Sequence, residues 1–114
     1  MKKIYSYELN CEYDSRQSFY GKALVTVYET NSVEHKELQS YNTLVANYVY
    51  YKNKNLKVYE YFGKYSQTTT RHQKEFFKQL GLSEKEIKEL FKNGKLEKET
   101  IKIYDNDLVE KLEK

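Results

Sequence analysis

The chain of 114 residues has no proline, no tryptophan, only four glycines and one cysteine, Cys11. A single cysteine cannot form a disulfide within the chain, which fits a reducing cytoplasm, so a hydrophobic core has to hold the fold. The length suffices for one such core, and we expect a single domain spanning residues 1–114. No apolar run approaches the ~20 residues that a membrane-spanning helix needs. No signal peptide is expected after Met1-Lys2-Lys3, so we expect a cytoplasmic protein without a membrane partner.

The motifs of common catalytic and cofactor sites are missing as well. The glycines are scattered, which excludes a glycine-rich phosphate loop, and no HExxH, paired CxxC or GxSxG pattern occurs. Cys11, His35 and His72 do not have the spacing of metal ligands. His72 follows several hydroxyl side chains, but no acidic residue has the spacing that would orient its imidazole. We therefore expect no cofactor, no metal and no enzymatic activity; a small nuclease or hydrolase using His72 is the alternative that remains.

Lysine and tyrosine are abundant, with 18 Lys against two Arg, and 13 Tyr. The net charge of +3 is unevenly placed, because residues 52–78 carry seven basic and two acidic side chains. The basic ones are Lys52, Lys54, Lys57, Lys64, Arg71, Lys74 and Lys78. This local excess either favours an anionic partner or is ordinary solubility charge on a hairpin and an exposed helix face.

The first half of the sequence predicts strands. Residues 3–9 and 22–30 are rich in β-branched and aromatic side chains, and residues 40–51 and 56–62 predict a hairpin joined at Lys52–Asn55. By alternation, one face of the first arm carries Leu44, Ala46, Tyr48 and Tyr50, and one face of the second carries Lys57, Tyr59 and Tyr61. A tyrosine-bearing face on each arm is either a platform for stacking bases or part of a core short of other large apolar residues.

The apolar period changes after Ser66. Phe76, Phe77 and Leu80 predict a helix over 69–80 that Gly81 ends, and Ser83 with Glu86 forms a capping box for a second helix over 84–92. Residues 100–104 predict a late strand, and a short helix is expected from Asp107. Residues 73–92 also have the spacing of a helix-turn-helix motif, but Phe77 stands where that motif needs a small residue. The sequence thus predicts an α+β domain, with an antiparallel sheet of about four N-terminal strands packed by a C-terminal αα-hairpin.

Polar residues crowd the predicted strand-to-helix junction at Ser66–His72, where they either cap the helix or bind a ligand. If strand 56–62 returns beside strand 40–51, the polar residues 41–43 become neighbours of this junction. We therefore expect one composite binding site. The candidate binding residues are Tyr41, Asn42, Thr43, Lys57, Lys64, Tyr65, Ser66, Thr68, Thr69, Arg71, His72 and Lys74.

Three blocks of the sequence carry a resemblance to a known family: SFYGKA at 18–23, SYNTLVA at 40–46 and YSQTTTRH at 65–72 with Phe76. In the patterns SYNTxVA and YSxTTxRHxxxF, residues 18–80 resemble small proteins with a domain of unknown function. Phages and mobile elements of low-GC Gram-positive bacteria encode these proteins. The resemblance implies a phage or mobile-element origin and action inside a bacterial host cell. It supplies no activity, and the segment after Gly81 is expected to lie outside it.

Together these observations predict a non-enzymatic binding protein that acts on host nucleic-acid machinery. Its expected partner is a host protein or a ribonucleoprotein complex, and one role consistent with its size and origin is inhibition of bacterial defence, as anti-CRISPR proteins do. The alternative is a regulatory protein that binds DNA or RNA directly through residues 52–78. The sequence leaves open whether the protein is a monomer or a homodimer.

Overall fold

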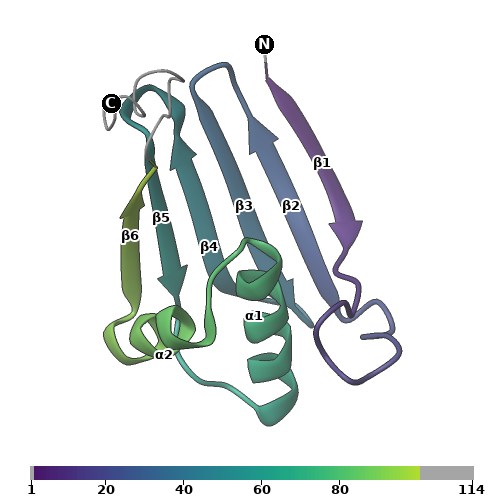
Figure 1. Cartoon of the computed structure of the whole chain (residues 1–114). Helices are drawn as coiled ribbons and strands as arrows, with labels where there is room; N and C mark the ends of the chain where they lie inside the picture. The colour runs from purple at the N-terminus through teal and green to yellow at the C-terminus, as the bar shows by residue number, and fades with distance from the viewer. Residues whose placement is uncertain (1, 101–114) are drawn as a thin grey trace.

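A computed structural model of the protein, which describes residues 2–100, has a six-stranded antiparallel sheet with two helices on one face (Figure 1). The elements in chain order are β1 (Lys3–Glu8), β2 (Ala23–Glu29), β3 (Val33–Ser40), β4 (Thr43–Tyr51), a short 3-10 turn η1 (Lys52–Lys54), β5 (Leu56–Tyr61), α1 (Gln67–Gln79), α2 (Glu84–Asn93) and β6 (Lys95–Glu99). Each strand pairs with the strand before it, giving the spatial order β1-β2-β3-β4-β5-β6. The predicted α+β class is confirmed, although the sheet has more strands than expected.

All four predicted strands are present, and two further strands complete the sheet. The sequence pattern misses β3, whose residues 34–37 are polar on both faces. It also misses β6, which ends at Glu99, just before the late strand expected at 100–104. Residues 101–104 and the helix expected from Asp107 lie outside the described residues.

Both predicted helices are confirmed, and so are their end signals. Gly81 adopts a left-handed conformation with φ +95°, and the amide of the following residue, Leu82, donates to the Phe77 carbonyl at 3.1 Å. This is the Schellman arrangement, which glycine favours because it has no Cβ to clash at positive φ. Ser83 and Glu86 form the predicted capping box. The Lys78–Glu84 ion pair, at 2.6 Å, joins the two helices across the turn. The pair is an αα-hairpin packed on the sheet, with Phe77 fully buried.

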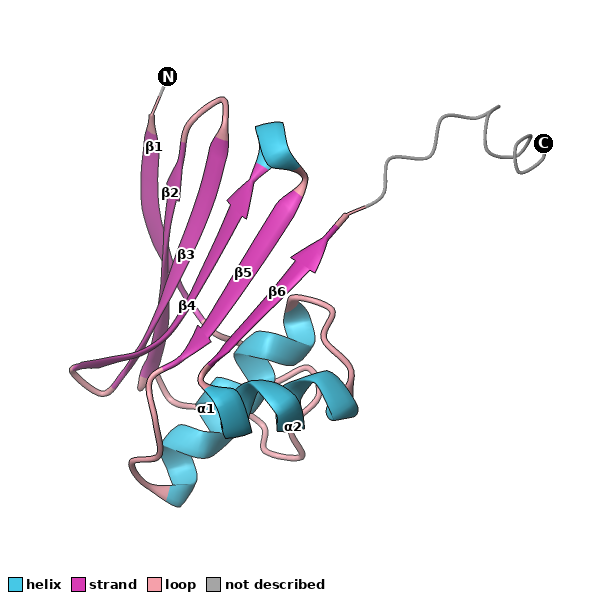
Figure 2. Cartoon of the chain, turned by 90° about the vertical axis from the view of Figure 1, so that its left-hand side faces the viewer, coloured by secondary structure: helices cyan, strands magenta, loops and turns pink. Residues whose placement is uncertain are grey.

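The helices cover only one end of one face of the sheet. Figure 1 shows them in front of the lower half of the strands, and Figure 2 shows the opposite face without any helix. We call the half of the sheet beneath the helices the covered end and the other half the open end. The core at the covered end is made by Val25, Leu38, Ala46 and Tyr59 of the strands with Phe76, Phe77, Ile87 and Leu90 of the helices. No helix within residues 2–100 is long and apolar enough to cross a membrane.

The tyrosine faces of the two hairpin arms coincide. Tyr48 pairs with Tyr59 in the β4–β5 register, and both side chains are buried under the helices. A β-bulge between β3 and β4 breaks the predicted alternation, so Val45 is buried and Leu44 is exposed, not aligned with Ala46 as expected. These tyrosines therefore belong to the core.

Candidate functional site

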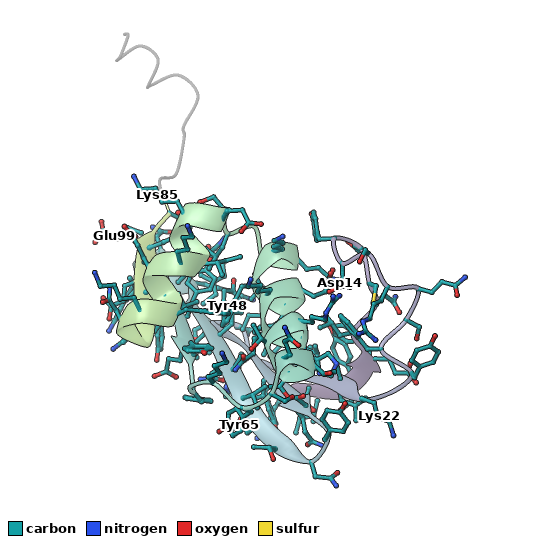
Figure 3. All side chains as sticks on the ribbon, turned by 90° about the horizontal axis from the view of Figure 1, so that it is seen from below. Asp14, Lys22, Tyr48, Tyr65, Lys85 and Glu99 are labelled. Carbon is teal, nitrogen blue, oxygen red and sulfur yellow. The ribbon has the colours of Figure 1, made fainter. Side chains whose placement is uncertain are left out.

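Helix α1 is tied to the loop between β1 and β2 by polar side chains on one of its faces. Arg71, Glu75 and Gln79 are four residues apart and so lie one above another on the helix. The buried Glu75 carboxylate accepts three successive backbone N–H groups of residues 12–14, at 2.9, 3.0 and 2.8 Å. Arg71 forms an ion pair with Asp14 at 2.8 Å. Seen from below, α1 lies between α2 and the loop that carries Asp14 (Figure 3). These contacts fix the loop against the helix.

A second face of α1 meets strand β3 through a chain of hydroxyl groups that ends on a histidine. Ser66 is the N-cap of α1, because its Oγ accepts the backbone N–H of Thr69 at 3.1 Å. The Ser66 hydroxyl donates to Thr69 Oγ1 at 3.3 Å, and Thr69 Oγ1 lies 2.9 Å from Ser40 Oγ. Ser40 Oγ in turn lies 2.8 Å from His72 Nδ1. The distances allow either direction along this chain; we assign each hydroxyl as the donor to the next, which makes Nδ1 an acceptor and places the imidazole proton on Nε2. The capping interpretation of Ser66 is confirmed.

His72 is fully buried, yet its Nε2 has no hydrogen-bond partner among the described residues. The ring is held by the edge of Phe19, with ring centres 4.5 Å apart, and by Tyr41 at 5.9 Å. Burial lowers the pKa of His72, since desolvation penalises the charged imidazolium. The side chain therefore presents a neutral imidazole with one unused nitrogen.

This histidine lines a cavity of about 210 Å³ at the covered end, which we call the corner pocket. Its lining residues are Arg16, Ser18, Phe19, Tyr20, Lys22, Tyr41, Thr68 and His72. The lining contains two cationic side chains and no acidic one. It also offers four hydroxyl groups, so the pocket is chemically suited to an anionic or hydrogen-bond-accepting group.

Two tyrosines of the corner pocket hold a backbone conformation that bulky residues rarely adopt. Tyr20 has φ 54° and Tyr41 has φ 58°. The two turns are joined by the backbone N–H of Tyr41, which donates to the Lys22 carbonyl at 2.7 Å. Such conformations cost roughly 1–3 kcal/mol each and cluster at functional sites. Because both side chains are exposed, at 74% and 49%, burial of the rings does not offset this cost.

The structure brings together part of the predicted composite site. Tyr41, Thr68 and His72 line the corner pocket, and Ser66 and Thr69 support it from the hydroxyl chain. Of the first polar block, Tyr41 lies beside the second, with its ring centre 5.9 Å from that of His72, and the preceding Ser40 bonds to Thr69. Asn42 and Thr43 are exposed in and after the β3–β4 turn, Tyr65 is exposed just before the α1 cap, and Lys64 is exposed between β5 and α1.

The basic residues of segment 52–78 are divided between the two ends of the sheet. Lys52 pairs with Glu29 at 3.1 Å, and Lys57 lies over the Tyr50 ring at 5.3 Å, both at the open end. Arg71, Lys74 and Lys78 belong to α1 at the covered end, where two of the three are in ion pairs.

A larger cavity of about 450 Å³ lies on the other side of α1 and includes Lys74. Its remaining charged groups are already engaged: Arg71 with Asp14, Glu75 with the loop amides, and Lys78 with Glu84. The corner pocket is the better candidate site because its cationic groups form no ion pair among residues 2–100.

Sequence reasoning missed the five pocket residues that come from the β1–β2 connection, namely Arg16, Ser18, Phe19, Tyr20 and Lys22. Residues 12–21 have the composition of a loop, which conceals that Phe19 is buried and anchors the pocket. The available signal was the SFYGKA block, since four of the five residues lie within it.

The pair Ser40 and His72 resembles a nucleophile and its base, at 2.8 Å. However, Ser40 is only 2% exposed, its Oγ also contacts Thr69, and no carboxylate bonds to the imidazole. Among residues 2–100, no group of His, Cys, Asp and Glu side chains is arranged to hold a metal ion. The geometry is that of a buried structural anchor with one free nitrogen.

A family model described as "Family of unknown function (DUF8033)" matches residues 7–94 of the chain. This span contains every residue of the corner pocket, and it continues past Gly81 through α2, further than the resemblance over residues 18–80 was expected to reach. Neither a curated protein nor a solved structure matches the chain.

Proposed function

The chain belongs to the family of unknown function DUF8033, and we propose that it is a non-enzymatic binding protein that acts on host nucleic-acid machinery. The observation that carries this proposal is the convergence of segments 18–23, 40–46 and 65–72 at one corner of the fold. These segments contribute exposed tyrosines around a cationic pocket. We propose that this corner is the surface that engages the partner.

The exposed tyrosines support a recognition role. Tyr20, Tyr41 and Tyr65 expose 74%, 49% and 52% of their surfaces, whereas Tyr48 and Tyr59 are buried. Tyrosine offers a large contact area at a low cost in conformational entropy and is enriched at binding hot spots. Two of the three are fixed by left-handed backbone conformations, so part of the ordering cost of binding is already met before the partner arrives.

The chemistry of the corner supports a partner from nucleic-acid machinery. Arg16 and Lys22 face no acidic side chain within the pocket, and aromatic rings stand beside them. Positive charge beside aromatic rings suits both nucleic acid and the surface of a ribonucleoprotein.

The resemblance to small phage and mobile-element proteins supports the origin that we propose. A phage-encoded binder of this size fits an inhibitor of bacterial defence, which would act by occupying a surface of a CRISPR effector or a similar complex. This step is an analogy from origin and size.

A pull-down from a bacterial host, with and without nuclease, tests the proposal. The tagged native protein should retain a protein partner that resists nuclease, and Tyr20→Ala/Tyr41→Ala should reduce capture by at least about tenfold. The matched control is Tyr5→Ala/Tyr51→Ala, which removes two exposed tyrosines from the open end. Equal capture by the two double variants would overturn the role of the corner. Recovery of only nuclease-sensitive material would instead favour direct DNA or RNA binding.

A further inference from the structure

The floor of the corner pocket has a hydrogen-bond donor without an acceptor. With Nδ1 accepting from Ser40, the proton of His72 lies on Nε2, which is buried and unpartnered. A buried donor left without an acceptor costs roughly 1–3 kcal/mol. Phe19 and Tyr41 pack against the ring and prevent it from turning towards another acceptor. His72 lines the pocket, but its Nε2 is covered in this structure, so a ligand oxygen would satisfy this nitrogen after a small movement of the side chains that cover it.

Two cationic side chains line the pocket without an ion-pair partner among residues 2–100. Arg16 and Lys22 are exposed, and neither forms an ion pair within residues 2–100. Two carboxylates lie nearby: Asp14 accepts from Arg71 and from the Arg16 backbone N–H, and the Glu8 side chain lies beside Gly21. Thr68, in the first turn of α1, also lines the pocket, and that turn contains no acidic residue. The positive end of the helix dipole therefore adds to the two cations.

The hydrogen-bond donors and cations of the pocket come from different segments of the chain, and this arrangement favours some anions over others. The cations belong to the β1–β2 connection, two of the hydroxyls belong to Tyr41 and Thr68, and the imidazole belongs to α1. The two oxygens of a carboxylate lie in one plane with its carbon, whereas the oxygens of a phosphate group are arranged tetrahedrally around phosphorus, and arginine is well suited to bind them. The volume of about 210 Å³ is several times the ~30 Å³ of a water molecule, so a phosphate group fits.

We propose that the corner pocket binds a phosphate group of a nucleic-acid strand, with Arg16 and Lys22 as the cationic contacts and His72 Nε2–H as the donor from the floor. The exposed rings of Tyr20 and Tyr41 stack on the adjoining nucleotide. This inference rests on the proposed function and deepens it, because it names the chemical group that the corner recognises in a nucleic acid or a ribonucleoprotein.

An NMR titration of the full chain tests the proposal with three probes: inorganic phosphate, a short single-stranded oligonucleotide with a 5′-phosphate, and the same strand with a 5′-hydroxyl. The native protein should bind phosphorylated DNA, and the His72 Nε2 resonance should shift on binding. If only the 5′-phosphorylated strand binds, the ligand is a terminal phosphate. If both strands bind with the same His72 shift, it is the backbone phosphodiester. Either result supports the proposal, and binding without a change at His72 would overturn it.

Charge-matched variants separate a specific pocket from general electrostatic attraction. Arg16→Ala/Lys22→Ala should weaken binding at least about tenfold. The control Lys85→Ala/Lys88→Ala removes the same charge from the exposed face of α2 and should change binding less than about twofold at the same ionic strength. Equal losses in the two variants, or competition by acetate as effective as by inorganic phosphate, would contradict a phosphate pocket.

The two experiments fail independently. A nuclease-resistant partner captured through Tyr20 and Tyr41 without any phosphate binding would leave the proposed function standing and remove the phosphate pocket. Phosphate binding at His72 without a captured protein partner would leave the pocket standing and make nucleic acid itself the partner.

Discussion

The two ends of the sheet differ in how much of their surface is buried. At the covered end, α1 and α2 bury apolar residues such as Val25 and Leu38, and Glu75 and His72 Nδ1 of α1 find hydrogen-bond partners in the loop and in β3. At the open end, no α-helix lies on either face of the sheet, and the short 3-10 turn η1 lies at the tip of the β4–β5 hairpin (Figure 2). Tyr5, Tyr50 and Lys57 there are exposed or half-buried. One set of strands therefore carries a core at one end and a solvated sheet at the other.

Cross-strand polar contacts replace a core on the face without helices. Tyr28 donates to Glu37 at 3.2 Å, and the Asn47 amide donates to Glu60 at 2.9 Å while its oxygen contacts His35. Such half-exposed contacts stabilise a sheet far less than buried apolar area. We expect the stability of the domain to depend mainly on the covered end.

The largest effect should follow from a cavity in the covered end. Phe77→Ala removes a fully buried ring that packs near Phe76 and Phe91, and it should lower the free energy of unfolding by roughly 3–5 kcal/mol. Tyr5→Ala at the open end should cost less than about 1 kcal/mol. Urea denaturation followed by circular dichroism measures both. Similar losses at the two sites would show that the open end is part of the core.

A smaller effect should follow from the loss of a buried polar anchor. Glu75→Ala leaves the amides of residues 12–14 without their acceptor, and it should destabilise the protein by about 2–3 kcal/mol. Glu37→Ala removes a carboxylate that is only partly buried, on the face of the sheet without helices, and should lower the free energy of unfolding clearly less. Denaturation curves give both values, and the amide resonances of 12–14 report whether the loop is released. A native-like loop in Glu75→Ala would refute the anchoring role.

The smallest effect concerns pH. Burial lowers the pKa of His72 in the folded state, so the folded protein binds fewer protons than the unfolded chain. Its contribution to stability is fully present above the unfolded pKa of about 6.5 and is lost as the pH falls below it, by at most about 1.4 kcal/mol per pH unit. Stability measured between about pH 7 and 5 should decrease in the native protein and less steeply in His72→Gln. If His35→Gln reduces the pH dependence of stability and His72→Gln does not, the titrating histidine lies at the open end and this prediction is wrong.

The same contrast explains which parts of the fold the sequence could predict. Elements that contact the core were predictable: α1, α2 and the strands with apolar alternation carry the pattern that burial imposes. β3 could not be predicted because only Leu38 and Ser40, at its covered end, are buried. Residues 33–37 lie where neither face of the strand needs to be apolar. The β-bulge reverses the sides of Leu44 and Val45, and no local sequence signal marks it.

The candidate site was predictable only in part, for a related reason. Tyr41, Thr68 and His72 stand out because they belong to clusters of polar residues beside predicted strands and at the start of a predicted helix. Arg16, Ser18 and Lys22 do not stand out, because a loop of polar residues is ordinary in sequence. Contacts from residues about 60 positions later in the chain, the Glu75 carboxylate and Arg71, hold that loop beside the helix, and the local sequence does not show them.

The unbroken strand order also has a consequence for how the protein assembles. Each strand from β2 to β5 pairs with the strand that precedes it in the sequence, so these pairings form between near neighbours in the chain and carry a low cost of loop closure. Only β6 must wait until the 33 residues between it and β5 have folded into the αα-hairpin. We therefore expect β6, the last strand to dock, to be the first to detach, and its amides to exchange with deuterium sooner than those of the central strands.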